Sequence, residues 1–493
     1  MICITIAQES RHLLLADMLN AVALGADMLE VRLDCLEKAP SFADMLSARR
    51  KPILFSCRRP QDGGNWQGSE EERLMLLRQA IMSKADYVEI EYDVAEQIRP
   101  FPGCQRVISY TNKEKMPTAI GEIYDDMLNL QPDIIKITVR ARVPEEAWPL
   151  LKILGRQKVP TVVVGLGRPG LMLALLGRKL GAPWTQAALE RGMETYPGEP
   201  TIADLVQIYR LRDIGKPTRF VGVTGVSERE FITAGLMNSA FVGNHVHHRV
   251  LPLTIGNYTL FHKIIDAVRL QAVVVNEQSY VHLHKLAQWD ESAKTPVQAG
   301  DFLLPRDNGS WIASNTLASW VIQCLEEKLR VKEPESNDLF SGRVVMFAGV
   351  GPQARMLAQS FKSRGAALVF ASKNRQEATR ASQLFGGRVM AWEGIYATLH
   401  DILILESEHK DDEPALEQDE LPLHPGYLKP TMTILDLSHM PRRSPFLEEA
   451  QLRGCSIVEP ADLLIAQVCD HVQRLTGSSP DRTGIRSFAE SLL

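Results

Sequence analysis

The feature that most constrains the fold is an alternation of short β-branched runs with longer helical patterns over residues 1–215. Such alternation is typical of βα units around a parallel sheet. Eight strands are expected: Ile2–Ile6, Met28–Leu33, Ile53–Cys57, Tyr87–Tyr92, Arg106–Tyr110, Ile134–Val139, Thr161–Val164 and Pro183–Ala187. Eight such units predict a (β/α)8 barrel, in which the active site lies at the C-terminal ends of the strands.

A second alternation starts at Arg219 and predicts a smaller α/β unit over residues 219–330, followed by a polar loop at Lys332–Ser341. The strand-like run Val344–Ala348 then leads into a G-x-G-x-x-A turn and a helical pattern. This order predicts a Rossmann dinucleotide-binding unit over residues 340–460. The remaining residues, 461–493, are expected to form a helical segment that packs back on the unit at 219–330. The predicted fold class is α/β throughout.

Charge and apolar patterning exclude several classes of protein. The chain has 55 Lys and Arg against 60 Asp and Glu, with no long basic run, so nucleic acid is not an expected partner. The longest apolar stretch, Gly170–Leu176, is far below the ~20 residues that span a bilayer. No secretion signal precedes the first strand, and the seven cysteines are scattered. We therefore expect a cytoplasmic protein with reduced thiols, and a homodimer is left open.

Lys136 lies inside the hydrophobic run Asp133–Thr138. Burying a lysine costs free energy, so a lysine in such a run is expected to have a function. A lysine amine attacks a ketone to form an iminium, which makes the neighbouring C–H bond more acidic. Lys136 is therefore a candidate Schiff-base residue. The alternative is a lysine at a strand end whose ammonium group reaches solvent.

Charged residues also stand at the ends of the second and third predicted strands. Glu30 and Arg32 are two residues apart and so point to the same side of a strand, and Arg58 follows the next strand. Guanidinium groups bind carboxylates bidentately, so this set suits a polyhydroxylated carboxylic acid. A surface ion pair is the alternative for each residue alone.

At this point the first half resembles the type I 3-dehydroquinate dehydratases. Four segments have the order and spacing of that family: E-V-R-L-D at Glu30–Asp34, C-R-R-P-Q-D-G-G at Cys57–Gly64, V-I-S-Y at Val107–Tyr110 and D-I-I-K at Asp133–Lys136. The resemblance implies that Lys136 forms the iminium and that Glu30, Arg32 and Arg58 contact substrate. It also places Asp62 where the family has a glutamate.

Three family positions carry other residues in this chain. Thr111 stands where the family has the histidine that moves protons, Ala174 near the position of an arginine, and Glu199 at that of a glutamine. A threonine cannot act as a base near pH 7. The dehydration implied by the resemblance is therefore predicted to be slow.

The second half resembles shikimate dehydrogenase through Asn315-Thr316 after a strand, the turn at Gly349–Ala354 and the segment Pro460–Gln467. The resemblance implies that Asn315 and Gln467 bind substrate. Four positions depart from the family, and two of them are Phe231 and Thr233, which stand where the family has substrate-binding serines. Tyr280 stands at the catalytic lysine's position, or Lys285 in a shifted alignment, and Leu317 stands at that of its partner aspartate.

The glycine-rich turn predicts where a cofactor binds. Gly349 permits the tight turn, Gly351 lets the backbone approach a pyrophosphate, and Ala354 allows the helix to pack closely. Lys373 and Arg375 follow the next strand, where an NAD enzyme has an acid for the ribose. These basic residues favour NADP, so NADPH is predicted to bind more tightly than NADH.

A group of histidines could be taken for a metal site. It comprises His245, His247 and His248 together with His282 and His284. These histidines lack a companion carboxylate at metal-ligand spacing, so no metal site is expected.

Together the two resemblances cover nearly the whole chain and imply a shikimate-pathway fusion. Its expected substrates are 3-dehydroquinate, dehydrated through Lys136, and 3-dehydroshikimate, reduced to shikimate with NADPH. Two alternatives stay open because of the substituted site positions. One is a paralogue that keeps both folds but has lost one or both activities and serves in binding or regulation. The other is an enzyme re-specified for a related keto acid.

Overall fold

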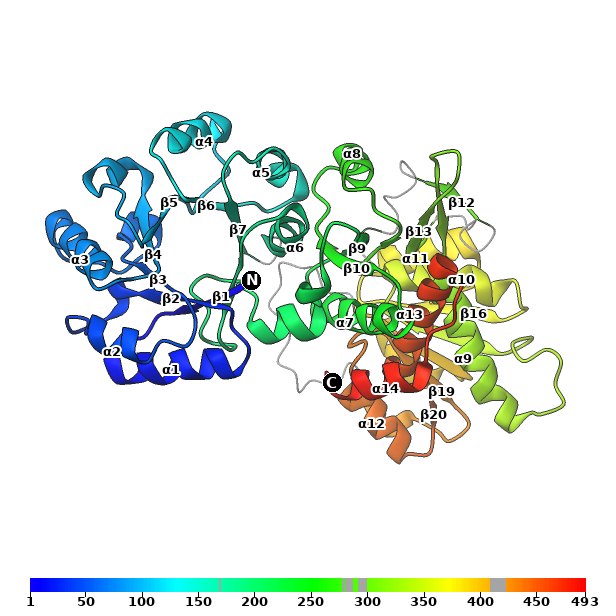
Figure 1. The fold of residues 1–493 in the computed structure, drawn as a ribbon. Helices are drawn as coiled ribbons and strands as arrows, with labels where there is room; N and C mark the ends of the chain where they lie inside the picture. Colours follow the sequence, from blue (N-terminus) through cyan, green and yellow to red (C-terminus); the bar gives the residue numbers. More distant parts are fainter. Residues whose placement is uncertain (168–169, 277–278, 280–286, 291–298, 408–422) are drawn as a thin grey trace. The chain divides into compact units, whose positions relative to one another are not determined.

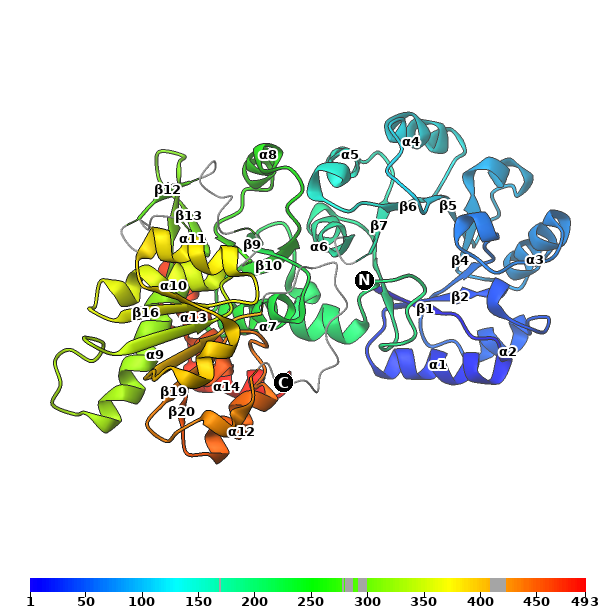
Figure 2. The same cartoon turned by 180° about the vertical axis from the view of Figure 1, so that it is seen from behind.

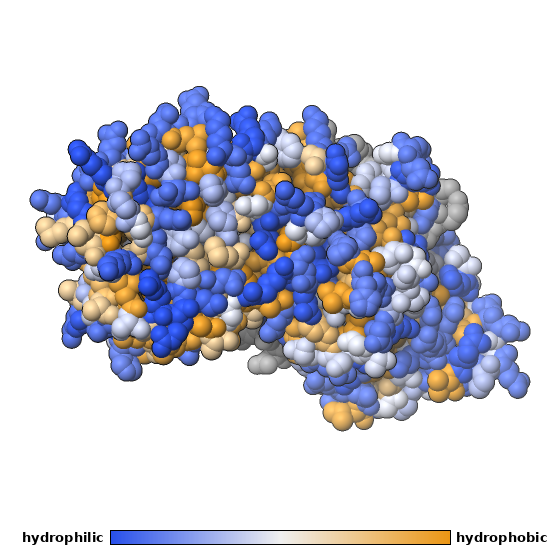
Figure 3. All heavy atoms as spheres, in the orientation of Figure 1, coloured by the Kyte–Doolittle hydropathy of each residue, from blue (hydrophilic) through white to orange (hydrophobic). Residues whose placement is uncertain are grey.

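The computed structural model describes residues 1–493 apart from 168–169, 277–278, 280–286, 291–298 and 408–422. The chain divides into two compact units: Met1–Arg219 with Arg249–Ala267, and Phe220–His248 with Val268–Leu493. Within the described ranges, no helix combines the length and apolar character needed to cross a membrane. On the face drawn in Figure 3, hydrophilic side chains lie among the hydrophobic ones.

The first unit is the predicted eight-stranded parallel barrel, with helices outside the strands (Figure 1). Its strands run in the order β7-β6-β5-β4-β3-β2-β1-β8. The strands are β1 (Ile2–Ile6), β2 (Met28–Arg32), β3 (Ile53–Ser56), β4 (Tyr87–Glu91), β5 (Gln105–Asn112), β6 (Ile134–Arg140), β7 (Thr161–Leu166) and β8 (Thr185–Ala188). The helices are α1 (Arg11–Ala23), α2 (Phe42–Ser47), α3 (Glu70–Met82), α4 (Ile120–Asn129), α5 (Pro144–Gly155) and α6 (Leu171–Leu180).

Strand alternation builds the barrel interior in layers. One buried cluster gathers an apolar residue from most of the strands, and its members include Cys3, Met28, Leu54, Val107, Ile134, Val162 and Trp184. Side chains two residues further along a strand point to the same side. That next step brings Thr5, Glu30, Ser56, Ser109, Lys136 and Gln186 inward. The barrel therefore carries a polar layer above an apolar floor.

A mixed six-stranded sheet has the order β10-β9-β11-β13-β14-β12. Its strands belong to the second unit except β10, which lies mostly in the segment Arg249–Ala267 of the first. Its strands are β9 (Arg219–Thr224), β10 (His248–Leu253), β11 (Val273–Val274), β12 (Gln288–Trp289), β13 (Phe302–Pro305) and β14 (Trp311–Ser314). The helices of this part are α7 (Glu228–Gly243), α8 (Tyr258–Val268) and α9 (Thr316–Lys332).

The last sheet is parallel, and its order is β17-β16-β15-β18-β19-β20. Counted along the chain this is 3-2-1-4-5-6, the Rossmann order, as predicted. Its strands are β15 (Val344–Ala348), β16 (Ala367–Ala371), β17 (Arg388–Met390), β18 (Ile402–Leu405), β19 (Thr433–Asp436) and β20 (Ser456–Ile457). The switch point of such a sheet, where a ligand is expected, lies between β15 and β18.

Helices α10 (Pro352–Lys362) and α11 (Arg375–Phe385) pack beside β16, which is visible from behind in Figure 2. The chain ends in α12 (Pro445–Leu452), α13 (Pro460–Thr476) and α14 (Arg482–Glu490). Helix α13 contacts α7 and α9, which brings its side chains next to the mixed sheet's helices. The domain boundaries given above stay predictions.

Candidate active sites

Lys136 lies in the polar layer of the barrel, 1% exposed. Its Nζ donates to Glu30 Oε2 at 3.1 Å and to Glu89 Oε2 at 2.9 Å. A strand-end lysine reaching solvent is therefore not what the structure shows. The amine sits between two carboxylates, each of which is placed to accept a proton from it.

Glu30 is held by donors from three other strands or loops. Its oxygens accept from Ser56 Oγ at 2.7 Å, from Gln186 Nε2 at 2.8 Å and from the guanidinium of Arg58. Burial alone would raise the pKa of Glu30, but Arg58 and Lys136 lower it well below its usual range. Glu30 is thus an anion whose charge keeps the two cations in place.

A pocket opens above this ion cluster and holds about 490 Å³ of empty space, its mouth included. Its lining residues include Glu30, Arg58, Asp62, Thr111, Lys136 and Tyr196. Thr111 faces the pocket where the resemblance expects a histidine, and no histidine is among the described residues that line it. The structure therefore brings the predicted nucleophile to a pocket without the predicted base.

Of the predicted residues Asp62 and Arg32, only Asp62 lines the pocket. Asp62 lines the pocket and accepts from Arg59 Nε at 2.6 Å. Arg32 donates to both oxygens of Asp34, at 2.9 and 2.6 Å, and to the carbonyl of Gly63 at 3.2 Å. It is not among the residues that line the pocket, and it contacts the loop that carries Gly63.

Sequence reasoning missed Glu89 and Gln186. Gln186 Nε2 donates to Thr5 Oγ1 at 2.6 Å as well as to Glu30, and so ties β8 to β1 and β2. Both residues stand two positions beyond an interior residue of their strand, which is the signal that could have found them. Glu91, two residues after Glu89, instead accepts from Arg73 Nη1 at 2.7 Å.

Glu199 lies on the loop that follows β8 and is 4% exposed. One of its oxygens accepts from the Thr195 amide at 2.7 Å and from Thr195 Oγ1 at 2.9 Å. The other oxygen is buried without a hydrogen-bond partner among the described residues. Burial raises the pKa of Glu199 to about 7, and Glu30 adds to the increase. Its carboxyl therefore takes up a proton at a higher pH than an exposed glutamate does.

Glu199→Gln tests this assignment through the pH dependence of stability. The pKa of Glu199 rises from 4.5 in the unfolded chain to about 7 in the folded protein. Between pH 4.5 and pH 7 the folded state therefore binds a proton that the unfolded state has lost. Its contribution to stability is therefore lost as pH rises from 4.5 to 7. The glutamine variant should lack this decline and be more stable at pH 8 by about 1–3 kcal/mol, the cost of a buried unsatisfied group. Parallel calorimetric profiles for the two proteins would contradict the assignment.

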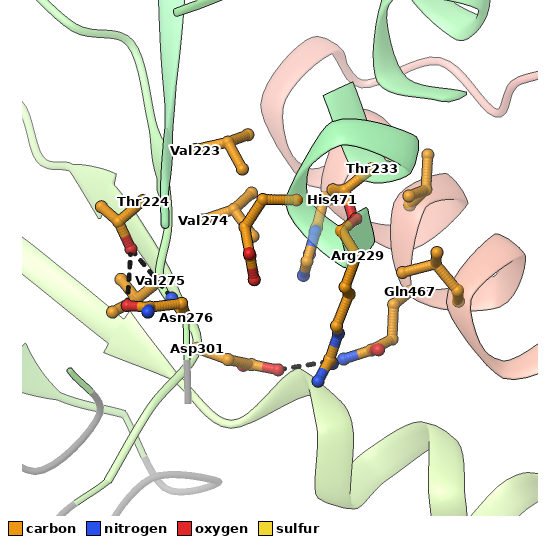
Figure 4. Close-up of a pocket in the computed structure, with 13 residues that line it drawn as sticks. Val223, Thr224, Arg229, Thr233, Val274, Val275, Asn276, Asp301, Gln467 and His471 are labelled. Carbon is orange, nitrogen blue, oxygen red and sulfur yellow. Dashed lines mark hydrogen bonds between the residues drawn. The ribbon is translucent and has the colours of Figure 1, made fainter. Parts of the chain in front are cut away.

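The second unit holds a pocket of about 410 Å³ between β9, α7 and α13 (Figure 4). Asp301, Gln467, Arg229, Thr233 and His471 are among its lining residues. Asp301 accepts from the amide and hydroxyl of Thr316 at 2.7 and 2.9 Å and from Gln467 Nε2 at 3.0 Å. Burial raises the pKa of Asp301. Sequence reasoning found Gln467 but missed Asp301.

Asn315, predicted to bind substrate, caps helix α9. Its Oδ1 accepts from the Ala318 amide at 3.0 Å and its Nδ2 donates to the Met356 carbonyl at 3.0 Å. Leu317 is fully buried in α9 where the resemblance expects an aspartate. Tyr280 and Lys285 lie outside the described residues.

The glycine-rich turn has the backbone that a dinucleotide site requires. Gly349 has φ of 93°, a conformation that favours glycine, and Gly351 directly precedes α10. However, the carboxylate of Glu406, the residue after β18, accepts from the amides of Gly351, Gln353 and Ala354 at 3.0, 2.8 and 2.7 Å. These are the donors that a pyrophosphate would need. The turn as it stands does not fit one.

The two predicted 2′-phosphate ligands flank the start of α11. Lys373 lies 5.5 Å from the ring centroid of Trp392, and Arg375 is the first residue of α11. Among the residues that the structure covers, no group of three or more His, Cys, Asp and Glu side chains could hold a metal ion. His282 and His284 fall outside that part of the chain.

Comparison with known proteins agrees with the two-part organisation. A family model described as type I 3-dehydroquinase matches residues 2–216. The 3-dehydroquinate dehydratase of Methanopyrus kandleri is 32% identical over 200 residues, covering 39% of this chain and 91% of that protein. The chloroplastic bifunctional 3-dehydroquinate dehydratase/shikimate dehydrogenase of Arabidopsis thaliana is 25% identical over 498 residues, covering 97% of this chain and 82% of that protein.

Among solved structures, a shikimate dehydrogenase in complex with NADP+ is similar at a TM-score of 0.47 and 17% identity, over 56% of this chain and 96% of that one. The dehydroquinate dehydratase and shikimate dehydrogenase from S. pombe has a TM-score of 0.43 and 15% identity, over 99% of this chain and 98% of that one. Residues 2–216 thus belong to the type I 3-dehydroquinase family, and the whole chain is a fusion of the type I dehydroquinase/shikimate dehydrogenase kind.

Proposed function

We propose that the barrel dehydrates 3-dehydroquinate to 3-dehydroshikimate through an iminium on Lys136. The observation that carries the proposal is the position of Lys136, buried at the floor of a pocket and hydrogen-bonded to two carboxylates. We propose 3-dehydroquinate as the substrate because the similar proteins of Methanopyrus kandleri and Arabidopsis thaliana are 3-dehydroquinate dehydratases. The covalent route is supported by the placement of the amine. Lys136 is buried, its Nζ is next to two carboxylates, and it lines the pocket where a ketone would bind.

The chemistry follows from the groups around the amine. Glu89 takes a proton from Lys136, and the free amine adds to the substrate's ketone and expels water, leaving an iminium. The iminium acidifies the adjacent C–H bond, so loss of that proton gives an enamine. The enamine expels the hydroxyl one carbon further on as water. Hydrolysis then returns the lysine and releases the conjugated enone.

Charge in the pocket supports an anionic, hydroxylated substrate. Arg58 lines the pocket and its side chain is 14% exposed, so part of it is accessible to a ligand. A carboxylate binds guanidinium more strongly than a neutral group does. Asp62, on the same wall, is placed to accept hydrogen bonds from hydroxyl groups.

Turnover of 3-dehydroquinate by the whole protein tests the proposal. We expect slow formation of the conjugated enone, followed by its ultraviolet absorbance, with the rate proportional to protein concentration. An Arg58→Ala variant should raise KM, because it removes the group that faces the substrate's carboxylate. No enone at any protein concentration would overturn the proposal.

For the second unit, the pocket of Figure 4 supports a ligand of the same class, a small polyhydroxylated acid. Asp301 and Gln467 provide an acceptor and a donor for hydroxyl groups, and Arg229 provides a cation. The NADPH-dependent reduction predicted from the sequence needs two more things: a proton donor near the carbonyl and a nucleotide at the turn. Leu317 provides no proton, and the turn is filled by Glu406. The proposal for this unit is therefore ligand binding, the alternative that keeps the fold without the reaction.

A further inference from the structure

The backbone amides at the Rossmann turn, which we call the anion seat, are occupied by a side chain of the protein itself. The first amides of a helix point at its N-terminus without helical partners, and the helix dipole favours negative charge there. At the start of α10 three such amides, those of the N-cap residue Gly351 and of Gln353 and Ala354, all donate to Glu406. The amides that make the turn an anion site are thus engaged by a carboxylate.

The place of Glu406 in the sheet brings its side chain to these amides. It directly follows β18, which pairs with β15, so it lies at the switch point of the sheet beside the turn. The Glu406 amide also donates to the Ala348 carbonyl at 3.0 Å, which fixes its backbone to the end of β15. Its side chain is 9% exposed. The carboxylate is therefore part of the packed turn and not a surface group resting on it.

The glycines of the turn fit this arrangement as closely as they would fit a nucleotide. A Cβ on Gly351 would collide with the carboxylate of Glu406, and a Cβ on Gly349 would collide with its backbone carbonyl. The close approach of Glu406 to the turn thus explains why glycines stand at these positions, without a bound pyrophosphate. A pyrophosphate on the same amides would meet a like charge within hydrogen-bond distance.

We infer that Glu406 is an internal substitute for the dinucleotide pyrophosphate, so that this unit does not take up NADPH while Glu406 is in place. Dinucleotide binding then requires the carboxylate to leave three amide donors and a buried position. Hydrogen bonds to charged groups correspond to roughly 10–100-fold in affinity each, so the expected loss is at least about 100-fold. The inference is independent of the dehydration proposed for the barrel.

Calorimetric titration of the full chain with NADPH tests the inference. The first variant is Glu406→Ala, which removes the carboxylate from the turn amides. The control is Glu448→Ala, which removes the same charge from an exposed position on helix α12. The unmodified protein and Glu448→Ala should bind NADPH at least about 100-fold more weakly than Glu406→Ala. Equal affinity in all three proteins, or tight binding by the unmodified protein, would overturn the inference.

Inorganic pyrophosphate gives a second readout that needs no nicotinamide. It should raise the unfolding temperature of Glu406→Ala and leave that of the unmodified protein unchanged, because only an open seat binds it. If Glu406→Ala responds to neither pyrophosphate nor NADPH, the turn is not an anion seat and the inference fails. Glu406→Gln keeps the shape but loses the charge, and it replaces the alanine variant in both measurements if that variant does not fold. It should then bind both ligands more tightly than the unmodified protein, and no gain in affinity would overturn the inference.

Discussion

Replacing Lys136 with methionine is expected to lower the rate of 3-dehydroquinate dehydration by about 10⁴–10⁶-fold, the range seen when a nucleophile that acts with its partners is removed. Methionine nearly fills the volume of the lysine but has no amine to form the iminium. The enone assay measures the change. Residual dehydration within tenfold of the unmodified protein would contradict the covalent mechanism.

The same substitution also leaves Glu30 and Glu89 without the ammonium that they share. Breaking a buried ion pair on one side typically costs about 3–5 kcal/mol, so loss of activity must be separated from loss of folding. Lys136→Arg is the matched control, because it keeps the positive charge but forms no imine. We expect it to be folded by circular dichroism and as inactive as the methionine variant.

Thr111→His is expected to accelerate the dehydration by about 10²–10⁴-fold, the usual contribution of a positioned acid–base group. Thr111 lines the pocket and pairs in register with Thr138 of the strand that carries Lys136, so a histidine there reaches the same space. The gain should appear in kcat, because the proton is moved in the reaction and not in binding.

The outcome identifies the group that moves protons in the unmodified protein. An unchanged kcat in a folded Thr111→His protein would mean that another residue already serves as base. Glu199 would then be examined first, because burial brings its pKa to about 7 and it lies on the loop that provides Tyr196 to the pocket. Thr111→Asn, which has no basic group, is the control for simple filling of the pocket.

Strand periodicity was sufficient to predict the barrel and a buried lysine, Lys136, inside it. The run around Lys136 is short, apolar and β-branched, and a charge in such a run has few explanations besides a site at the barrel centre. The same periodicity also predicts Glu89 and Gln186, once an apolar floor is identified two residues earlier on each strand. The predicted pocket residues Glu30, Arg58 and Asp62 do gather around the lysine.

Pattern matching was less informative where one residue type has two structural roles. Arg32 stands at a strand end like Arg58, but a neighbouring Asp34 engages its guanidinium through two hydrogen bonds. Asn315 follows a strand as the resemblance requires, yet it caps a helix, a role that asparagine fills as readily as ligand binding. Asp34 belongs to the same E-V-R-L-D motif, but nothing in the motif shows that Asp34 engages the guanidinium of Arg32.

The turn at Gly349–Ala354 shows the limit of a local motif more plainly. Its glycines and alanine are compatible with an anion seat whatever anion fills it. The residue that fills the seat, Glu406, comes from a strand more than fifty positions away in the chain. Only the pairing of β18 with β15 brings the two together, and no local sequence signal records that pairing.

Borohydride trapping tests the central claim most directly. The unmodified protein is mixed with 3-dehydroquinate, reduced with borohydride, digested and examined by mass spectrometry. The Schiff-base mechanism predicts loss of activity together with a covalent adduct on the peptide that contains Lys136, and no adduct in Lys136→Met. An adduct that persists in Lys136→Met, or enone formation by the unmodified protein with no trapped adduct at Lys136, would contradict it.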